Sequence, residues 1–248
     1  MKEELKPVNS MNPLKGFTAA RISMGLVGSS IPLNNLLEFK LAHAHARDAV
    51  YSNLDIEGLP NSLKQFNLPV LQLHSQAENR ARYLQRPDLG RKLNLASTEQ
   101  LIAANADIAI IIADGLSAEA VNKNVNGLLT VLIPKLLAAK FKLAPICLVE
   151  QGRVAIGDDI AYGLKAKLSL MLIGERPGLS AADSMGAYLT YDPAPGLTDE
   201  LRNCISNIRP MGLNYNLAAD KIFYLIQESF KRKLSGVQLK DNAGLLDQ

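Results

Sequence analysis

Several features that would define a class of protein are scarce or absent in this sequence of 248 residues. It contains no tryptophan and only two cysteines, Cys147 and Cys204. Two cysteines do not make the disulfide framework of a small secreted domain, and they fit a reducing cytoplasm. No apolar run reaches the length of a membrane span, and the amino end lacks the apolar core of a secretory signal. We therefore expect a cytoplasmic protein.

The sequence also lacks a large excess of charge of either sign. The chain has 27 Lys and Arg against 24 Asp and Glu, a net charge of +3, and the two signs are interspersed. This balance gives no strong case for binding to nucleic acid or to an anionic membrane. What remains is an ordinary globular composition, 48% hydrophobic, and a length that allows one large or two small domains.

The first third of the chain shows helical patterns and little sign of strands. Residues 1–15 hold prolines and polar residues, and we expect them to form a flexible tail. Apolar residues recur near helical spacing over 33–53, and shorter helices are expected over 62–65 and 71–84. The sequence therefore predicts a small all-helical domain over residues 16–92.

From residue 93 to 248 the pattern changes to alternating strands and helices. Buried strands are expected over 107–113, 146–149, 168–173 and 186–191. Helices are expected over 118–139, 158–167, 198–204 and 217–234, with Ser117, Asp158 and Thr198 as amino-terminal caps. The strands are apolar throughout rather than alternating, which is typical of a parallel sheet covered by helices on both faces. We predict an α/β domain of this kind.

Two histidines on the first expected helix invite a metal site. His43 and His45 are two residues apart, however, and residues at that spacing do not share a helix face. Arg47 lies four residues after His43, and a positive neighbour disfavours a metal ligand. We therefore expect this helix to serve packing or a subunit contact, and no metal site.

The turn after the strand at 107–113 carries a second candidate. Asp114, Gly115, Leu116 and Ser117 form a strand–turn–helix junction of the type that cradles phosphate at a helix amino end. The G-x-G-x-x-G spacing and the P-loop pattern are both absent. A stand-alone nucleotide-binding α/β enzyme that uses Gly115 and Ser117 remains an alternative.

Two other loops belong to the same edge of the predicted sheet. Residues 151–159 follow one strand, and residues 174–178, with two glycines and a proline around Glu175, follow the next. Open α/β sheets hold their ligands at the carboxyl ends of the strands. Residues 201–207, beyond the fourth strand, are expected to end a helix near the same place. The three segments would then line one broad surface.

The exact amino-acid sequence of several segments is more specific to one family than the spacing of their residues. GERPGL at 174–179, GAYLTY at 186–191 and NCISNIRP at 203–210 occur in that order. Near the amino end ARISMGLVGSSIP precedes LLEFKLAHAHARDAV. In these motifs, over roughly Phe17 to Leu239, the chain resembles the small subunit of ethanolamine ammonia-lyase.

The resemblance implies a function and partners. Members of that family convert ethanolamine to acetaldehyde and ammonia by a radical route that depends on adenosylcobalamin. It implies that substrate and catalytic residues lie on a separately encoded large subunit, a TIM barrel, and that this chain is active only in a hetero-oligomer. It also implies a Rossmann-like cobalamin-binding domain over residues 93–248 and, as an alternative location, a bacterial microcompartment.

The resemblance also assigns residues to the cofactor. Val154 in RVAIGD, Glu175 in GERPG and Cys204 in RNCISN match the family's cobalamin-binding positions. Glu175 would accept hydrogen bonds from corrin amides, and Val154 and Cys204 would pack on the cofactor. The D-x-H-x-x-G motif, by which some proteins replace the lower base of cobalamin, is absent. A non-catalytic cobalamin carrier or a structural partner remains a further alternative.

Overall fold

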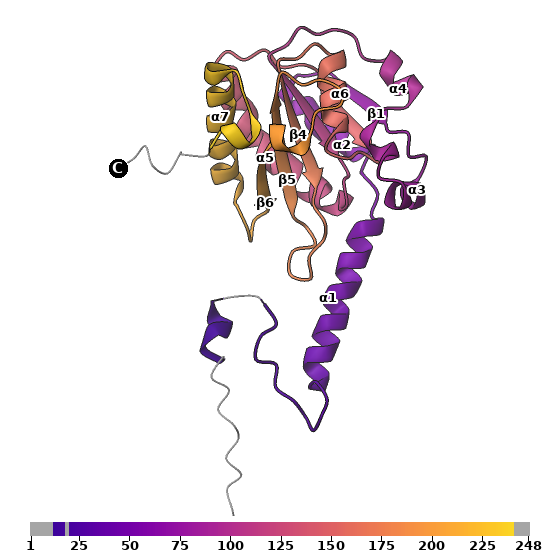
Figure 1. Ribbon diagram of the computed structural model, residues 1–248, viewed down its shortest axis with the longest axis vertical. Helices are drawn as coiled ribbons and strands as arrows, with labels where there is room; N and C mark the ends of the chain where they lie inside the picture. Colours follow the sequence, from indigo (N-terminus) through magenta and orange to yellow (C-terminus); the bar gives the residue numbers. More distant parts are fainter. Residues whose placement is uncertain (1–11, 18–19, 241–248) are drawn as a thin grey trace, which may run out of the picture.

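The apolar runs of the sequence meet in one six-stranded sheet (Figure 1). A computed structural model of the chain describes residues 12–17 and 20–240. The strands are β1 (Val70–His74), β2 (Ile108–Ala113), β3 (Ile146–Glu150), β4 (Leu168–Gly174), β5 (Met185–Tyr191) and β6 (Asn203–Ile208). Their spatial order is β1-β3-β2-β4-β5-β6. The first four are parallel, whereas β5 and β6 join antiparallel, so the sheet is mixed.

The helices are α1 (Leu33–Tyr51), α2 (Gly58–Leu63), α3 (Arg80–Gln85), α4 (Leu95–Glu99), α5 (Ala118–Ala138), α6 (Ile156–Gly163) and α7 (Tyr215–Arg232). Short 3-10 helices occur at Asn12–Gly16, Lys64–Phe66, Leu89–Arg91, Asp199–Leu201 and Gly236–Gln238. The expected tail over residues 1–15 lies outside the described residues except for its last part. Within the described residues, no helix is long and apolar enough to cross a membrane.

The prediction of an α/β sheet is confirmed, and the prediction that it is parallel holds for four strands. β4 and β5 are paired in register from Leu168 with Tyr191 to Gly174 with Met185. The segment between them, Glu175–Ser184, contains no helix. A parallel neighbour needs a long crossover, usually a helix, whereas a short loop returns the chain antiparallel. The expected strand at 186–191 is therefore present with the opposite direction.

The predicted helix over 71–84 is wrong in its first half. Val70–His74 forms β1, which pairs parallel with β3, and α3 begins only at Arg80. Two leucines, Leu71 and Leu73, face the apolar cluster beneath α6. The short strand was hidden because its pattern is also compatible with helical spacing. Part of the segment expected to be helical thus belongs to the sheet, and the division into domains near residue 92 remains a prediction.

The predicted helix over 198–204 is also wrong. Only Asp199–Leu201 makes a helical turn, of the 3-10 type, and Cys204 lies in the edge strand β6. Ile205 and Ile208 point into the core, while Cys204, Ser206 and Asn207 are exposed. Burial on one face only is typical of a strand at the edge of an antiparallel ladder.

The two faces of the sheet are covered differently. On one side, here called the closed face, α5 and α7 pack over the strands, and Ile110, Leu170 and Leu189 are almost completely buried. On the other side, here called the open face, α6 packs on β2 and β4. The outward residues of β6 on this side are exposed. The sheet therefore leaves a free surface over β6.

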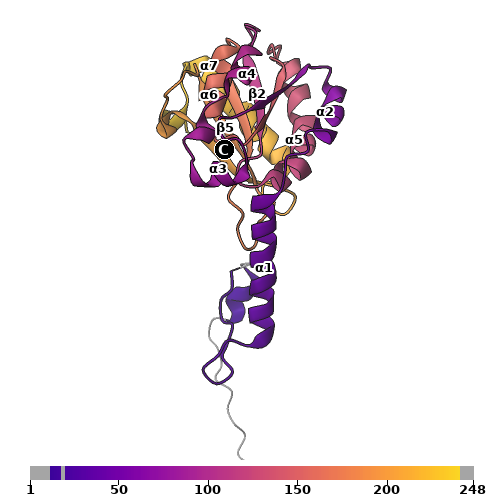
Figure 2. The ribbon, with the colours of Figure 1, turned by 90° about the vertical axis from the view of Figure 1, so that its right-hand side faces the viewer.

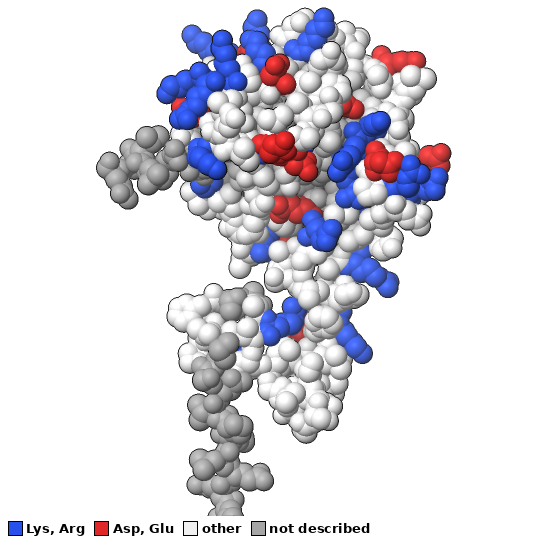
Figure 3. Space-filling model, viewed as in Figure 1, with Lys and Arg blue, Asp and Glu red and all other residues white. Residues whose placement is uncertain are grey.

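α1 extends away from the sheet in both views (Figures 1 and 2). The prediction of this helix is confirmed. Of its residues only Ala49 is buried, whereas Leu33, Leu37 and Leu41 are more than half exposed. Much of the surface in this part of the molecule is uncharged (Figure 3). Apolar side chains gathered on a projecting helix are typical of a protein–protein contact.

Candidate functional site

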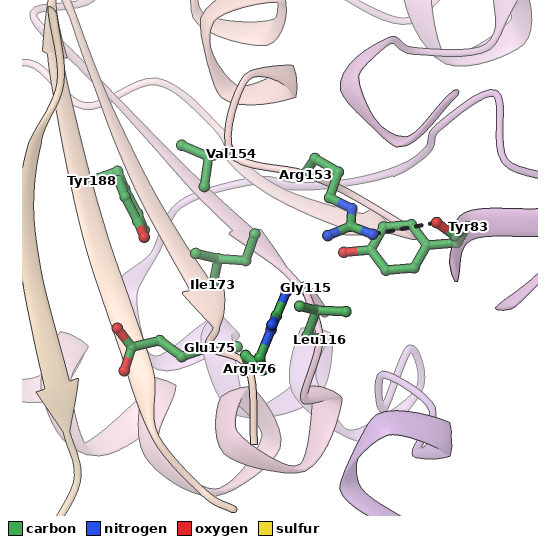
Figure 4. A pocket seen from close by; sticks show the side chains of 10 residues that line it. Tyr83, Gly115, Leu116, Arg153, Val154, Ile173, Glu175, Arg176 and Tyr188 are labelled. Carbon is green, nitrogen blue, oxygen red and sulfur yellow. Dashed lines mark hydrogen bonds between the residues drawn. The ribbon is translucent and has the colours of Figure 1, made fainter. Parts of the chain in front are cut away.

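A cavity of about 420 Å³ opens at the carboxyl ends of β2, β3 and β4 (Figure 4). The loops that follow these three strands supply most of its wall, as expected from the rule for open α/β sheets. Its lining includes Tyr83, Gly115, Arg153, Val154, Glu175 and Tyr188. The structure therefore brings Val154 and Glu175, two of the three predicted site residues, to one cavity.

Glu175 is held in place by two hydrogen bonds to one carboxylate oxygen. The Ser184 hydroxyl and the Asn207 backbone N–H, the latter at 3.1 Å, both donate to Oε2. Within the described residues Oε1 accepts no hydrogen bond. A Cβ at Gly186 would lie 3.1 Å from this Oε1, so a side chain at that position would crowd the carboxylate. The arrangement leaves Oε1 as an oriented acceptor for a ligand.

Cys204 lies one strand further along the same face. It pairs with Tyr188 across β5 and β6, and its side chain is exposed. It does not line the cavity, but Tyr188 does. Burial, with the neighbouring Cys204 thiol and Glu175 carboxylate, raises the pKa of Tyr188, so its phenol stays protonated and can donate. The three predicted residues thus follow one path, from the cavity onto the open face.

Sequence reasoning missed Tyr188, Tyr83 and Arg153. Tyr188 stands between Ala187 and Leu189, which both face the closed side. That alternation was a usable signal, because it assigns the tyrosine to the opposite face. Tyr83 comes from α3 and meets the loop after β3 only in the folded chain. No local pattern reveals that contact.

Several donors of the turn after β2 are already used within the protein. The Leu116 N–H donates to the Gly174 carbonyl at 3.0 Å, and the Ser117 hydroxyl donates to the Ala182 carbonyl at 2.9 Å. Ser117 also caps α5 by accepting from the Ala120 N–H, as predicted. A Cβ at Gly115 would lie 2.2 Å from the Gly174 carbonyl oxygen. The turn is packed against β4, which disfavours the nucleotide-binding alternative.

Asp114 connects the turn after β2 to the loop that carries Val154. It accepts hydrogen bonds from the N–H groups of Gln151 and Gly152, at 2.9 and 3.0 Å, and lies 3.6 Å from Nη1 of Arg80. Burial raises the pKa of Asp114 to about 6, against the opposing effect of these partners. The carboxyl group fixes the position of one wall of the cavity.

Asp158 does not cap α6, contrary to the prediction. It forms an ion pair with Arg202, and both side chains are 3% exposed. Arg202 also pairs with Asp199 at 2.6 Å. Burial raises the pKa of Asp158, and Arg202 opposes that shift. The pair joins α6 to the start of β6 beside a second cavity of about 720 Å³.

The histidines of α1 line neither of these two cavities. His43 and His45 are both exposed, and His43 stacks on Phe39 with ring centroids 6.4 Å apart. Across the described part of the chain, no group of three or more His, Cys, Asp or Glu side chains is arranged to hold a metal ion.

The chain is similar to proteins of one family over nearly its whole length. The family model described as Ethanolamine ammonia-lyase light chain matches residues 8–240. An ethanolamine ammonia-lyase small subunit of Pseudomonas fluorescens (strain Pf0-1) is 49% identical, over 97% of this chain and 91% of the relative. Small subunits of Pseudomonas aeruginosa (strain LESB58) and Pseudomonas putida (strain KT2440) are each 49% identical, over 95% and 96% of this chain and 88% and 89% of theirs. The chain belongs to the ethanolamine ammonia-lyase light chain family.

Proposed function

We propose that this chain is the small subunit of an adenosylcobalamin-dependent ethanolamine ammonia-lyase, and that it holds one side of the cofactor. The observation that carries the proposal is the position of Val154 and Glu175 in one cavity at the ligand edge of the sheet, with Cys204 on the adjoining surface. Membership of the ethanolamine ammonia-lyase light chain family supports the proposal, and the reaction, the conversion of ethanolamine to acetaldehyde and ammonia, is what the resemblance implies.

The residues present fit a corrin. Its flat ring needs apolar contact, and its amide side chains need hydrogen-bond acceptors and donors at the rim. Val154 and Ile173 supply apolar surface, Glu175 supplies an oriented acceptor, and Tyr188 supplies a donor. The cavity takes only part of so large a group, and the exposed face of β6 leaves room for the rest.

The chemistry is divided between subunits in this proposal. Adenosylcobalamin, when bound, supplies the radical chemistry of the reaction. The residues of this chain bind and orient the cofactor, and the loops after β3 and β4 exclude water from one side of it. The substrate lies on the large subunit. The exposed apolar residues of α1 are the part of this chain best suited to contact that subunit.

Replacement of Glu175 by alanine tests the proposal in the complex of this chain with a large subunit. The hydrogen bonds of a carboxylate to amide groups contribute about 1.5–3 kcal/mol, so the dissociation constant for cyanocobalamin should rise about 10- to 100-fold. Absorbance titration measures it. The affinity for ethanolamine should change little, because substrate contacts are expected on the other subunit.

Glu99→Ala is the matched control, since Glu99 is an exposed glutamate at the end of α4. It should leave the cofactor affinity unchanged. If a folded Glu175→Ala complex bound cyanocobalamin as tightly as the wild type, Glu175 would be removed from the site. The assignments of Val154 and Cys204 would then lose their support.

A further inference from the structure

Two arginines lie on the ring of one buried tyrosine. The Arg80 guanidinium is 4.7 Å and the Arg153 guanidinium 4.2 Å from the centroid of Tyr83, which is 0% exposed. The Tyr83 hydroxyl donates to the Gly152 carbonyl at 3.1 Å, which fixes the ring. Such contacts between a cation and an aromatic face are attractive and orient the planar guanidinium.

Only one of the two arginines, Arg80, has a carboxylate as counter-ion in the described part of the chain. Arg80 lies 3.6 Å from the Asp114 carboxylate and donates to the carbonyls of Val50 and Gly115, at 2.6 and 2.8 Å. Arg153 has no carboxylate within ion-pair distance in the described part of the chain. Its guanidinium donates one hydrogen bond, from Nη2 to the Tyr83 carbonyl at 3.3 Å. Its Nε is buried without a partner, as is Nη2 of Arg80, so the two arginines differ in the counter-ion.

Arg153 is nevertheless held rigidly at the cavity wall. Its backbone N–H donates to the Gly90 carbonyl at 2.7 Å, and a Cβ at Gly90 would lie 2.9 Å from Arg153 Cγ. The glycine therefore allows the side chain to lie close against this turn and on Tyr83. Figure 4 shows the guanidinium of Arg153 on one side of the cavity and the Glu175 carboxylate on the other, with Ile173 between them.

We propose that Arg153 is a ligand-binding residue of this cavity, where its guanidinium donates to an acceptor oxygen of the bound group. A partly buried cation without a counter-ion is stabilised when a carbonyl or phosphate oxygen meets its free donors. Glu175 opposite accepts from a donor, so the two residues fix the direction in which a ligand lies. The inference rests on the proposed function, in which the bound group is cobalamin. Cobalamin carries carbonyl oxygens in its amide side chains and phosphate oxygens in its nucleotide phosphodiester.

The test uses the complex of this chain with a large subunit and cyanocobalamin as the probe. Arg153→Met keeps the apolar stem on Tyr83 and removes the donors. It should raise the dissociation constant about 10- to 100-fold, the range for a lost hydrogen bond to a charged group. Arg153→Lys keeps the charge without the fork and should raise it by less, about three- to tenfold.

Arg86→Met is the control, because Arg86 is an exposed arginine directly after α3 that pairs with Asp88. It should bind cyanocobalamin as the wild type does. Thermal unfolding of each complex shows whether the variants are folded, and Arg153→Lys keeps the test informative if Arg153→Met is not. Unchanged affinity in a folded Arg153 variant overturns the inference and leaves the proposed function standing. A wild-type complex that binds no cobalamin overturns both.

Cobinamide, which lacks the nucleotide and its phosphodiester, separates the two sources of oxygen. If Arg153 meets an amide carbonyl of the corrin, Arg153→Met weakens cobinamide and cyanocobalamin by the same factor. If it meets the phosphodiester, the variant and the wild type bind cobinamide equally, and only cyanocobalamin distinguishes them. Either pattern supports Arg153 as a ligand-binding residue.

Discussion

The two faces of the sheet are stabilised in different ways. The closed face is a largely apolar layer in which side chains from the strands, α5 and α7 pack with little exposed area. The open face has a smaller apolar cluster under α6, and its loops are tied by buried polar groups, Asp114 and the Asp158–Arg202 pair. Apolar packing is non-directional, whereas hydrogen bonds to a carboxylate fix positions. The face that positions a ligand uses the directional interactions.

The largest expected effect comes from the ion pair of the open face. Arg202→Met leaves the buried Asp158 carboxylate without its partner. Removing one member of a buried pair destabilises a protein by about 3–5 kcal/mol, because an uncompensated charge remains. We expect a loss of that size in the free energy of unfolding, measured by urea denaturation of the isolated chain.

A second substitution separates this effect from ordinary loss of packing. In the double variant Asp158→Leu with Arg202→Met both charges are gone, and much of the lost stability should return. On the closed face, Leu189→Ala removes a fully buried side chain at a cost of about 2–5 kcal/mol that no removal of charge can restore. If the double variant were as unstable as Arg202→Met, the open face would depend on packing as the closed face does.

The next effect is a dependence of stability on pH. Burial raises the pKa of Asp114 from 3.8 to about 6, so the folded chain binds this proton more tightly than the unfolded chain. The associated stability is fully present below the unfolded pKa and is lost as pH rises through about 6. At about 1.4 kcal/mol per pKa unit, the loss is on the order of 3 kcal/mol.

Urea denaturation at a series of pH values between about 4 and 7 measures this loss. Other carboxyl groups titrate in the same window, and the lowered pKa of Asp107 acts with the opposite sign. The useful quantity is therefore the difference between the wild type and Asp114→Asn, which removes the titration. An identical slope in both proteins would show that Asp114 does not carry the pH dependence.

The contrast between the faces also explains what the sequence can predict. β2 and β4 and the helix α5 are apolar or strongly periodic within one segment, so their residues identify them. β1 and β6 were missed because each owes its structure to a neighbouring strand rather than to its own pattern. The proximity of Val154 and Glu175 follows from a general rule about strand ends.

The polar contacts of the open face could not be predicted in the same way. Arg153 and Tyr83 are 70 residues apart in the sequence, and Asp158 and Arg202 are 44 apart. No local spacing pairs them, and an aspartate before a helix is equally typical of a cap, which was the wrong prediction for Asp158. Such contacts become visible only once the fold has fixed which loops meet.

The smallest expected effect on stability comes from substitution of Cys204, on the exposed surface of the open face. The same residue tests whether the cofactor extends from the cavity to β6. Cys204 is exposed on β6, whereas Cys147 is buried in β3, where burial raises the pKa of its thiol to about 12. Thiolates react and buried thiols do not, so a thiol reagent should modify Cys204 alone in the native chain. Cys204→Ala should change the free energy of unfolding by no more than about 0.5 kcal/mol.

Cobalamin bound along the path from Val154 and Glu175 to β6 would cover this thiol. In the complex with a large subunit, cyanocobalamin should therefore slow the modification of Cys204, followed by mass spectrometry of the peptide that contains it. ATP at the same concentration is the control and should not slow it, whereas protection by ATP would favour a nucleotide at this face. If saturating cyanocobalamin left the rate of modification unchanged, the bound cofactor would not cover Cys204. The cofactor would then contact the cavity but not β6, and Cys204 would be removed from the site.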